Sequence, residues 1–272
     1  MTNSATIDQE PTFIEVGEGD GRRRIAVRAR AGSGPGSTGG APGLFWLGGF
    51  NSDMRGTKAL ALDAWAAEHG RACIRFDYSG HGESGGAFID GTIGRWLEEA
   101  VAVFDKFCRG PQVVIGSSMG GWLALLLNRA RRLKGDSRIH GLVLIAPATD
   151  MTELMLEQMP KKTRKLLDKQ GYVDVPSEYS AEPYRINKAL VEDGKQHLLF
   201  GRAIETGCPV TILQGARDKD VPKEHAARLV QHLIGDPAIF TVVPDGDHRL
   251  SRPDDLALLE RAIQQMIVER GI

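Results

Sequence analysis

The feature that most restricts the fold of this chain is an alternation of short apolar, β-branched runs with helical segments. Strands are predicted at residues 44–49, 72–77, 112–117 and 139–147, and helices at about 55–69, 92–108 and 119–133. Beyond residue 205 the pattern resumes with strands at 209–215 and 238–243 and helices at about 222–234 and 254–269. Short buried strands separated by helices are typical of a mostly parallel central sheet with helices on both faces. The sequence therefore predicts the α/β class.

Two segments depart from this alternation. Near the N-terminus, residues 12–17 and 22–30 predict an antiparallel hairpin, and the Gly-, Ser- and Pro-rich residues 31–43 predict a flexible hairpin tip. Residues 150–205 are charged and methionine-rich, and we expect them to form a small helical cap, or lid, between two strands. We call this segment the insertion. A length of 272 residues then suits a single domain, residues 1–272, that contains the insertion.

Composition and charge exclude several classes of protein. A formal net charge of −1 argues against a nucleic-acid partner, which would require a surplus of basic residues. The N-terminus lacks the features of a signal peptide, and the most apolar run, residues 120–128, is too short to span a bilayer. Three cysteines in unrelated contexts indicate reduced, buried thiols. We therefore predict a cytoplasmic protein with no integral membrane segment.

Residues 116–120, Gly-Ser-Ser-Met-Gly, match the pattern G-x-S-x-G only with Ser118 at its centre. The pattern lies between a predicted strand and a predicted helix, where a sharp turn strains the central residue and requires small neighbours. Such a turn raises the serine hydroxyl above the edge of the sheet. The alternative is a serine that only caps the helix. The two alternatives are separated by whether partner residues follow in the right order.

An acid and a histidine follow later strands, in the order that a serine nucleophile of this kind requires. Asp218 lies three residues after Gly215, in the loop at the end of a strand. Asp220 is the fallback, although its place close to Pro222 suits a helix cap. His248 follows the last predicted strand, whereas the other histidines lie in helices, at a strand start, in the insertion or in a polar loop. Ser118, Asp218 and His248 are the predicted catalytic residues.

Two backbone N–H groups are predicted to bind the oxyanion that forms during the reaction. One is the N–H of Met119, which follows the nucleophile at the N-terminus of a helix. The other lies in the loop after the first strand of the alternation, where Gly48 and Gly49 allow close approach of the backbone. Phe50 is the preferred donor in this loop, and Asn51 is the alternative.

Five blocks of sequence together resemble a known family: GGFNSDMRGTKA, ACIRFDYSGHGES, GSSMGGW, LQGARDKDVP and DHRL. They are similar to the α/β-hydrolase domain-containing branch that holds mitochondrial acyl-protein (palmitoyl) thioesterases and acyl-glucuronide esterases. The resemblance runs from about residue 44 to the C-terminus. It implies the α/β-hydrolase fold, the triad and oxyanion hole named above, and hydrolysis of an acyl thioester or ester. The sequence shows no mitochondrial targeting stretch, so we expect a bacterial-type relative.

The insertion is expected to select the substrate. Met151, Met155 and Met159 recur at helical spacing on one apolar face, which either roofs an acyl chain or packs the insertion onto the core. We assign these methionines, together with Asn51, to the predicted substrate pocket. The run KKTRK at 161–165 indicates either a solvated helix face or a contact for an acidic group. The glycine-rich loop DYSGHGES is expected to shape the pocket wall rather than to supply a second catalytic pair.

The leading prediction is a serine esterase or thioesterase that acts through an acyl-enzyme on a small-molecule or acylated-protein substrate. The alternatives are a small-molecule carboxylesterase, including one for acyl-glucuronide-type esters, and a C–C bond hydrolase with the same triad. A non-catalytic binding scaffold is disfavoured because all three members of the triad are present. The sequence predicts no cofactor and no metal site, and either a monomer or a homodimer.

Overall fold

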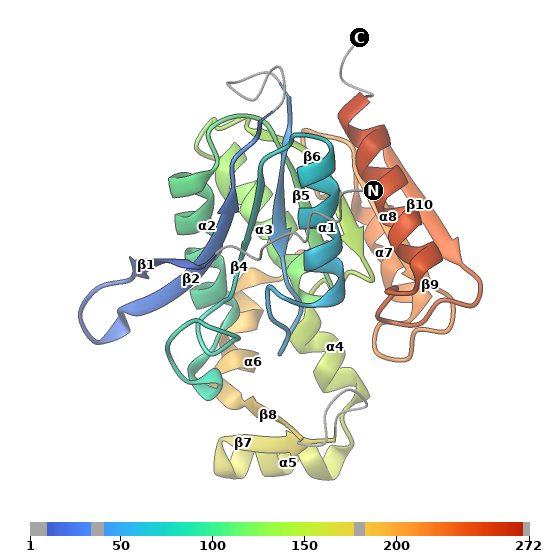
Figure 1. Ribbon diagram of the computed structural model, residues 1–272. Coiled ribbons are helices and arrows are strands. Elements are labelled where there is room, and N and C mark those ends of the chain that lie inside the picture. The colour runs from blue at the N-terminus through green and yellow to red at the C-terminus, as the bar shows by residue number, and fades with distance from the viewer. Residues whose placement is uncertain (1–9, 34–40, 177–182, 269–272) are drawn as a thin grey trace.

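The computed structural model describes residues 10–33, 41–176 and 183–268, and its centre is an eight-stranded sheet (Figure 1). The order across the sheet is β1-β2-β4-β3-β5-β6-β9-β10. These strands are β1 (Thr12–Val16), β2 (Arg23–Arg30), β3 (Gly43–Leu47), β4 (Cys73–Phe76), β5 (Gln112–Ser117), β6 (Ile139–Ile145), β9 (Val210–Gly215) and β10 (Ala238–Val243). Strand β2 is antiparallel to β1 and β4, and all pairs from β4 to β10 are parallel. The predicted α/β fold with a mostly parallel sheet is confirmed.

The connection between β2 and β3 differs from the prediction. A hairpin tip would join neighbouring strands, but β4 lies between β2 and β3 and pairs with both. The prediction of a hairpin tip at 31–43 is therefore wrong, while residues 34–40 themselves lie outside the described residues. The predicted hairpin of β1 and β2 is confirmed, with Thr12 opposite Val27. Local composition identifies a loop, but strand pairing across the sheet decides which strands that loop joins.

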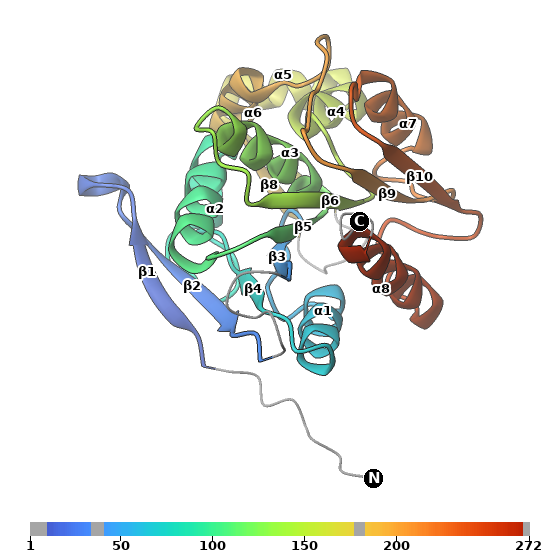
Figure 2. The same ribbon diagram turned by 90° about the horizontal axis from the view of Figure 1, so that it is seen from above.

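Helices cover both faces of the sheet, as the alternation predicted (Figure 2). Helices α2 (Ile93–Phe107), α3 (Met119–Arg132) and α7 (Lys223–His232) pack on one face, and α1 (Thr57–Glu68) and α8 (Pro253–Val268) on the other. Trp96 and Trp122 are fully buried in the core of the first face. A large side chain buried in this way stabilises the fold by about 1.5–3 kcal/mol. The helices thereby hold the sheet rigid beneath the loops at its edge.

The strand order brings several loops together at one edge of the sheet. Strands β3 and β5 are neighbours, with Leu47 opposite Gly116. Strands β9 and β10 are also neighbours, with Gly215 opposite Val243. The loops that follow parallel strands meet at the carboxyl edge of the sheet, which is where ligands bind in open α/β sheets. The predicted catalytic residues and Phe50 lie in these loops, and Met119 begins the helix that follows β5.

The insertion contains both helices and strands. Its elements are α4 (Met151–Gln158), α5 (Lys161–Gln170), β7 (Tyr172–Val175), β8 (Tyr184–Asn187) and α6 (Lys188–Gly194), followed by a short 3-10 helix, η3 (Lys195–His197). The expectation of a helical cap therefore missed an antiparallel two-stranded ladder of β7 and β8. Strands of four residues are too short to show a clear period of two. Residues 177–182 of the insertion lie outside the described residues.

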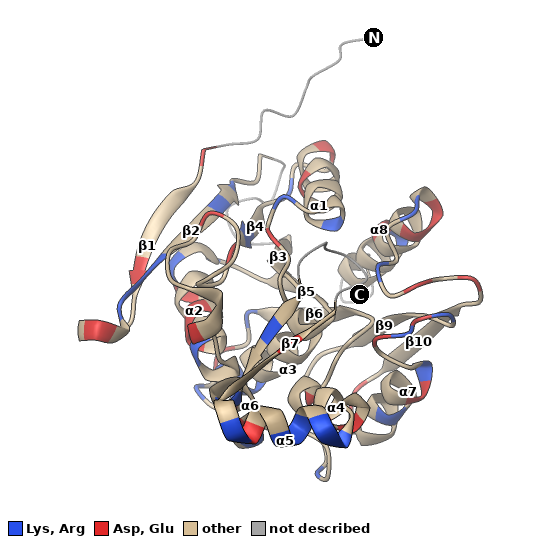
Figure 3. Ribbon diagram, turned by 90° about the horizontal axis from the view of Figure 1, so that it is seen from below, with Lys and Arg blue, Asp and Glu red and all other residues tan. Residues whose placement is uncertain are grey.

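The methionines of the insertion serve its packing. Met151 is buried in the main core, and Met159 is buried in a small core within the insertion. Met155 is half-buried and packs against both cores. The burial of Met151 and Met159 supports the packing interpretation of this face, and Met155 is the methionine of the three that keeps partial exposure. Helix α5 carries the mostly exposed KKTRK run, and the Lys and Arg positions colour its ribbon blue in Figure 3.

Two further expectations concern the membrane and the cysteines. Among the described residues, no helix is long and apolar enough to cross a membrane. The cysteines Cys73, Cys108 and Cys208 are buried free thiols, as predicted. Burial raises the pKa of the Cys73 thiol to about 12, so this group stays protonated and unreactive.

Candidate active site

Ser118 lies at a sharp turn between β5 and α3. Its φ of 54° and ψ of −118° are backbone angles that a residue with a side chain rarely adopts. A Cβ atom at Gly116 would lie 2.2 Å from the carbonyl oxygen of Gly120, and a Cβ at Gly120 would lie 2.0 Å from that of Leu47. Both glycines of the pattern are therefore required by close backbone contacts. The turn leaves Ser118 partly exposed, whereas Ser117 is buried.

The imidazole of His248 lies between Ser118 and Asp218. His248 Nε2 is 3.0 Å from Ser118 Oγ, and His248 Nδ1 is 2.8 Å from Asp218 Oδ2. Because an ionised carboxylate can only accept, Nδ1 carries the proton and Nε2 is the acceptor for the serine hydroxyl. The structure thus brings together the three residues that the sequence singled out. In this arrangement, His248 can take the hydroxyl proton while the carboxylate stabilises the resulting imidazolium.

The carboxylate of Asp218 is held by four donors. Its Oδ1 atom accepts from the backbone N–H groups of Asp220 at 2.9 Å and Val221 at 2.8 Å. Its Oδ2 atom accepts from His248 and from Gln214 Nε2, the latter at 3.0 Å. The Asp218 side chain is completely buried, so these hydrogen bonds replace its hydration. This geometry favours Asp218 over the fallback, Asp220, whose backbone serves to orient it.

The same residues also form a group that could be considered for a metal ion. Ligand atoms of Asp218, Asp220 and His248 lie within 4.8 Å of one another. A cation bound there would have to displace the donors on the Asp218 carboxylate and the proton on His248 Nδ1. The hydrogen bonds already satisfy these groups, so the arrangement is better explained as an acid–histidine pair than as a metal site.

The predicted oxyanion site lies where the loop after β3 approaches the serine. A Cβ atom at Gly49 would lie 3.3 Å from the Ser117 carbonyl oxygen and 3.4 Å from Ser118 Cβ, so the backbone here is very close to the nucleophile. Within the described residues, the backbone N–H groups of Phe50 and Met119 have no hydrogen-bond partner. The Asn51 N–H donates to His81 Nε2 at 3.1 Å. Of the two alternatives from the sequence, Phe50 is therefore the donor that is available to a substrate.

An aromatic cluster lies beside this loop. The ring of Phe50 lies 4.8 Å from that of Phe88, 6.0 Å from that of Trp96 and 5.9 Å from that of Tyr184, measured between ring centroids. Tyr184 belongs to β8, so the insertion reaches the oxyanion loop directly. Sequence reasoning did not identify Tyr184, because the only sign of its place is an aromatic residue in a short polar segment. Asn51 is exposed at the same loop.

Two supporting residues were also missed by the sequence reasoning. Gln214, at the end of β9, donates to Asp218, and a fully buried glutamine in an apolar strand was the available signal. Lys58, at the start of α1, donates from Nζ to the Arg249 carbonyl oxygen and to Ser251 Oγ, the latter at 3.2 Å. Lys58 thereby holds the loop that carries His248. No local pattern in the sequence links two segments that lie so far apart.

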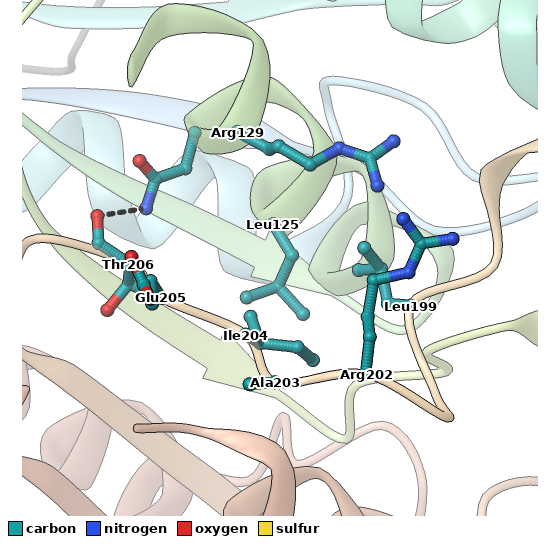
Figure 4. A pocket seen from close by; sticks show the side chains of 9 residues that line it. Leu125, Arg129, Leu199, Arg202, Ala203, Ile204, Glu205 and Thr206 are labelled. Carbon is teal, nitrogen blue, oxygen red and sulfur yellow. Dashed lines mark hydrogen bonds between the residues drawn. The ribbon is translucent and has the colours of Figure 1, made fainter. Parts of the chain in front are cut away.

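Two cavities lie elsewhere in the molecule. One, of about 50 Å³, lies between α3 and residues 199–206, and is flanked by Arg129 and Arg202 (Figure 4). The other, of about 410 Å³, lies between α5 and α6 in the insertion. Neither is lined by a member of the triad. A guanidinium stays protonated and cannot act as a base, so the first cavity offers no catalytic group comparable to the triad.

Comparison with known sequences gives a consistent result. The chain matches the profile of the Alpha/beta hydrolase family over residues 34–258. It is 34% identical over 228 residues to the mitochondrial palmitoyl-protein thioesterase ABHD10 of Bos taurus, and 32% identical over 228 residues to that of Homo sapiens. Each alignment covers 84% of this chain and 73% of the relative. The resemblance to the branch of mitochondrial acyl-protein thioesterases is confirmed.

Solved structures agree with this result. A crystal structure of a protein from Agrobacterium vitis S4 has a TM-score of 0.90 and 49% identity, and the match covers 95% of this chain and 98% of that one. Alpha/beta hydrolase domain-containing protein 10 from mouse has a TM-score of 0.82 and 29% identity, over 95% and 99% of the two chains. The predicted fold is confirmed. Because the ABHD10 relatives are mitochondrial by name, they give no support to the cytoplasmic location, which stays a prediction.

Proposed function

Because the chain belongs to the alpha/beta hydrolase family, we propose that it is a serine hydrolase that cleaves acyl thioesters or carboxylic esters through Ser118. One observation carries this proposal: the hydrogen-bonded series from Ser118 Oγ through His248 to the buried carboxylate of Asp218. The relatives that are named palmitoyl-protein thioesterases favour an acyl thioester as the substrate class. An acylated protein and a small acyl thioester share this chemistry.

In the proposed mechanism, Ser118 Oγ attacks the carbonyl carbon of the acyl group while His248 Nε2 takes its proton. The Asp218 carboxylate keeps the imidazole in the required tautomer and stabilises the imidazolium. His248 then returns the proton to the departing thiol or alcohol, which leaves an acyl group on Ser118. A water molecule, deprotonated by His248, attacks this acyl-enzyme and releases the carboxylic acid.

The negative charge on the tetrahedral oxygen is stabilised by the N–H groups of Phe50 and Met119. Loss of one such donor typically costs about 3 kcal/mol of transition-state stabilisation. Met119 is the first residue of α3, so the positive end of the helix dipole adds to this effect. No cofactor or metal ion takes part in any step.

We further propose that the chain forms one domain in which the insertion, residues 150–205, acts as a cap that selects the acyl group. The contact between Tyr184 and Phe50 supports this role, because it joins the insertion to the oxyanion loop. Met155 is half-buried and unbranched, which suits contact with a flexible acyl chain. The exposed KKTRK run is assigned to the solvated surface of α5.

A second candidate is a carboxylesterase for small esters, including acyl-glucuronide-type esters. The aromatic cluster of Phe50, Phe88 and Tyr184 favours this candidate, because an aromatic group of a small ester substrate would stack well against these side chains. This candidate uses the same triad, so only the choice of substrate separates it from the thioesterase. A C–C bond hydrolase would also use the triad, but no further contact among the described residues favours it.

The test is the hydrolysis rate of a series of acyl thioesters from short to long chains, with matched oxygen esters. Ser118→Ala is the inactive variant, and Ser117→Ala, at a buried neighbour outside the triad, is its matched control. We expect kcat/KM to rise with chain length for thioesters, to vanish in Ser118→Ala and to persist in Ser117→Ala.

Other outcomes have equally definite meanings. A rate confined to short oxygen esters would support the carboxylesterase and remove the thioesterase. Full activity in Ser118→Ala would remove the serine mechanism altogether. Activity that is lost on chelation of metal ions would support the metal interpretation of Asp218, Asp220 and His248.

A further inference from the structure

We infer that His81 is a positioning residue, which acts as a neutral hydrogen-bond acceptor to fix the loop that presents the Phe50 N–H to the oxyanion. This inference rests on the proposed function of the site, and it assigns a role to the loop DYSGHGES that the triad and oxyanion hole leave unused. His81 is not a catalytic residue, because it touches the oxyanion loop rather than the reacting atoms.

The oxyanion loop is a tight turn over residues 49–52. The Gly49 carbonyl oxygen accepts from the Ser52 N–H at 3.3 Å and from Ser52 Oγ at 2.9 Å. Asn51, the third residue of this turn, has a φ of 56°, in the left-handed region. Asparagine adopts this conformation more readily than most residues but still at a cost. The turn therefore needs a contact that holds Asn51 in place.

His81 supplies that contact. Its Nε2 atom accepts the Asn51 N–H at 3.1 Å. This hydrogen bond fixes the peptide plane between Phe50 and Asn51, while Ser52 fixes the plane between Gly49 and Phe50. Since a trans peptide is planar, holding both planes also sets the direction of the Phe50 N–H. Without the His81 acceptor, the peptide plane between Phe50 and Asn51 can rotate. The φ and ψ angles of Phe50 can then change, and the direction of its N–H changes with them.

The imidazole is itself locked in the orientation that this role requires. His81 Nδ1 lies 3.1 Å from the Ser79 carbonyl oxygen, which can only accept, so Nδ1 carries the proton and Nε2 is free to accept. The same carbonyl oxygen accepts from Trp96 Nε1 at 3.2 Å. The Ser79 N–H donates to Glu99 Oε2 at 2.8 Å, and Glu99 also accepts from Arg23 Nε at 2.6 Å. A chain of buried contacts thus joins the oxyanion loop to β2 and α2.

The surroundings of His81 keep the imidazole neutral. The side chain is 4% exposed and lies 5.1 Å from the ring of Phe88, 5.3 Å from that of Trp96 and 5.7 Å from that of Tyr78. Burial among these rings lowers the pKa of His81 to about 4, although the Ser79 carbonyl opposes the shift. A protonated imidazole would place a second donor against the Asn51 N–H. The proposed role of His81 therefore requires a neutral imidazole.

A second contact holds the segment that directly follows the oxyanion loop. Asp77 Oδ1 accepts the Met54 N–H at 2.7 Å, and Asp77 Oδ2 accepts the Glu83 N–H at 2.8 Å. The loop that contains Asp77 and His81 therefore binds the oxyanion loop and this segment at two backbone N–H groups, those of Asn51 and Met54. Because the Asp77 contact remains when His81 is replaced, removal of the imidazole should loosen the Asn51 end and leave the rest of the loop attached.

The test compares three variants of the full chain. His81→Leu removes the acceptor and keeps an apolar side chain, whereas His81→Gln retains an uncharged acceptor of similar reach. His140→Leu is the control: His140 Nε2 also contacts a backbone carbonyl, that of Met266, but His140 lies near the start of β6, at the opposite edge of the sheet. We expect kcat to fall by about 10- to 100-fold in His81→Leu with KM within about threefold, since an oxyanion interaction acts mainly in the transition state. His81→Gln should recover most of kcat, and His140→Leu should keep it.

A transition-state mimic gives a readout that a general packing defect would not reproduce. A trifluoromethyl ketone forms a tetrahedral adduct with the serine, and its inhibition constant should rise in His81→Leu by the same factor by which kcat/KM falls. Unchanged kcat in His81→Leu would overturn the inference. Equal losses in His81→Leu and His81→Gln would overturn the acceptor role, and a rise in KM alone would assign His81 to substrate binding instead.

Nitrogen NMR of the imidazole tests the inference without relying on a variant that folds. In the wild-type protein at neutral pH, the His81 resonances should show a protonated Nδ1 and an unprotonated Nε2. The opposite tautomer would overturn the inference even if His81→Leu failed to fold. If Ser118→Ala retained full activity, the proposed function would fail while the tautomer still reported on the loop. An inactive Ser118→Ala leaves the His81 variants as a test of this inference alone.

Discussion

The sheet edge and the insertion meet at Phe50 and Tyr184, yet they are held in place in different ways. At the sheet edge, Ser118 directly follows β5 and Asp218 lies three residues after β9, and the positions of both strands are set by ladders of backbone hydrogen bonds. Among its described residues, the insertion has a small core of five buried side chains, Met159, Leu167, Val173, Ile186 and Val191. It is tied to the body by a few apolar side chains in the main core, such as Met151 and Leu190, and by individual polar contacts. Asp193 accepts from the Gly94 N–H at 2.7 Å, and Asn187 donates to the Ile89 carbonyl oxygen.

This difference separates two tasks of the proposed enzyme, catalysis at the sheet edge and selection of the acyl group by the insertion. A strand ladder resists small displacements, so it suits the triad, where about 1 Å of misplacement can cost a hundredfold in rate. Single polar contacts and a small core can change without disturbing the sheet. We therefore expect variants at the sheet edge to act on kcat, and variants of the insertion to act on KM and on chain-length preference.

The largest expected effect is that of Asp218→Asn. An amide in place of the carboxylate would favour the wrong tautomer of His248, and kcat should fall by about 10⁴-fold. Asp220→Asn is the matched control, because the orienting group of Asp220 is its backbone N–H. Its kcat should stay within about fivefold of wild type, as measured with a single thioester substrate. Equal losses in the two variants would reverse the choice of Asp218 over Asp220.

A smaller effect, on the stability of the body, is expected from the titration of His81. Its pKa is about 4 in the folded protein against 6.5 for the ordinary group, because burial disfavours the charged form. Between these values the unfolded chain binds the proton and the folded chain does not, so stability falls as the pH falls through this window. The full loss is about 3 kcal/mol, because the pKa values of the folded and unfolded states differ by about 2.5 and a tenfold change in proton affinity corresponds to about 1.36 kcal/mol.

Denaturant unfolding at a series of pH values measures this effect, with His81→Gln as the comparison. The unfolding free energy of wild type should fall more steeply from pH 6.5 to 4 than that of His81→Gln. Burial raises the pKa values of Asp77 and Glu99, which face the same loop, but both groups are present in the two proteins and largely cancel in the difference. Parallel curves for the two proteins would contradict a buried, neutral His81.

Met159→Ala should destabilise the insertion without unfolding the rest of the protein. Removing this buried side chain from the small core should cost about 2–4 kcal/mol of local stability. Hydrogen exchange should become faster in residues 150–176 and 183–205, while kcat on a short-chain substrate stays within about threefold. Met155→Ala, at the half-buried position, should change chain-length preference with less effect on exchange. Loss of kcat in Met159→Ala would show that the insertion and the sheet edge are not independent.

The smallest effect is expected from the contact between the two regions. Tyr184→Ala removes the ring beside Phe50 and should raise KM for long-chain substrates by about threefold to tenfold, since an aromatic contact contributes about 1 kcal/mol. Tyr172→Ala is the matched control in the paired strand, because Tyr172 is exposed and stacks on Arg185. Equal KM values for the two variants would place the acyl group elsewhere.

Some features of the site were readable in the sequence because their causes are local. The glycines around Ser118 follow from a turn in which any side chain would meet backbone atoms. The strand and helix alternation reflects periodicity within each element, and it fixed the order of Ser118, Asp218 and His248 along the chain. The hydrogen bonds among these three residues then follow from the sheet, which brings the ends of β5, β9 and β10 to one edge.

Other features were not readable, because they depend on residues far apart in sequence. The segment after β2 looked like a hairpin tip, since nothing local shows that β4 will pair between β2 and β3. The ladder of β7 and β8 was missed because its strands have only four residues each. The methionine face of α4 left two interpretations open, and only its surroundings showed that Met151 and Met159 are buried.

The sequence by itself determined the fold class, the strained serine turn and the order of the predicted triad, because each arises from spacing and residue size over a few neighbouring positions. Only the tertiary structure favoured Phe50 over Asn51 as the proposed oxyanion donor, and only it pointed to the proposed role of His81. Both decisions depend on a single hydrogen bond between residues 30 positions apart, from Asn51 to His81. Such a contact leaves no periodic trace in the sequence, because it forms only after the sheet has brought the two loops together.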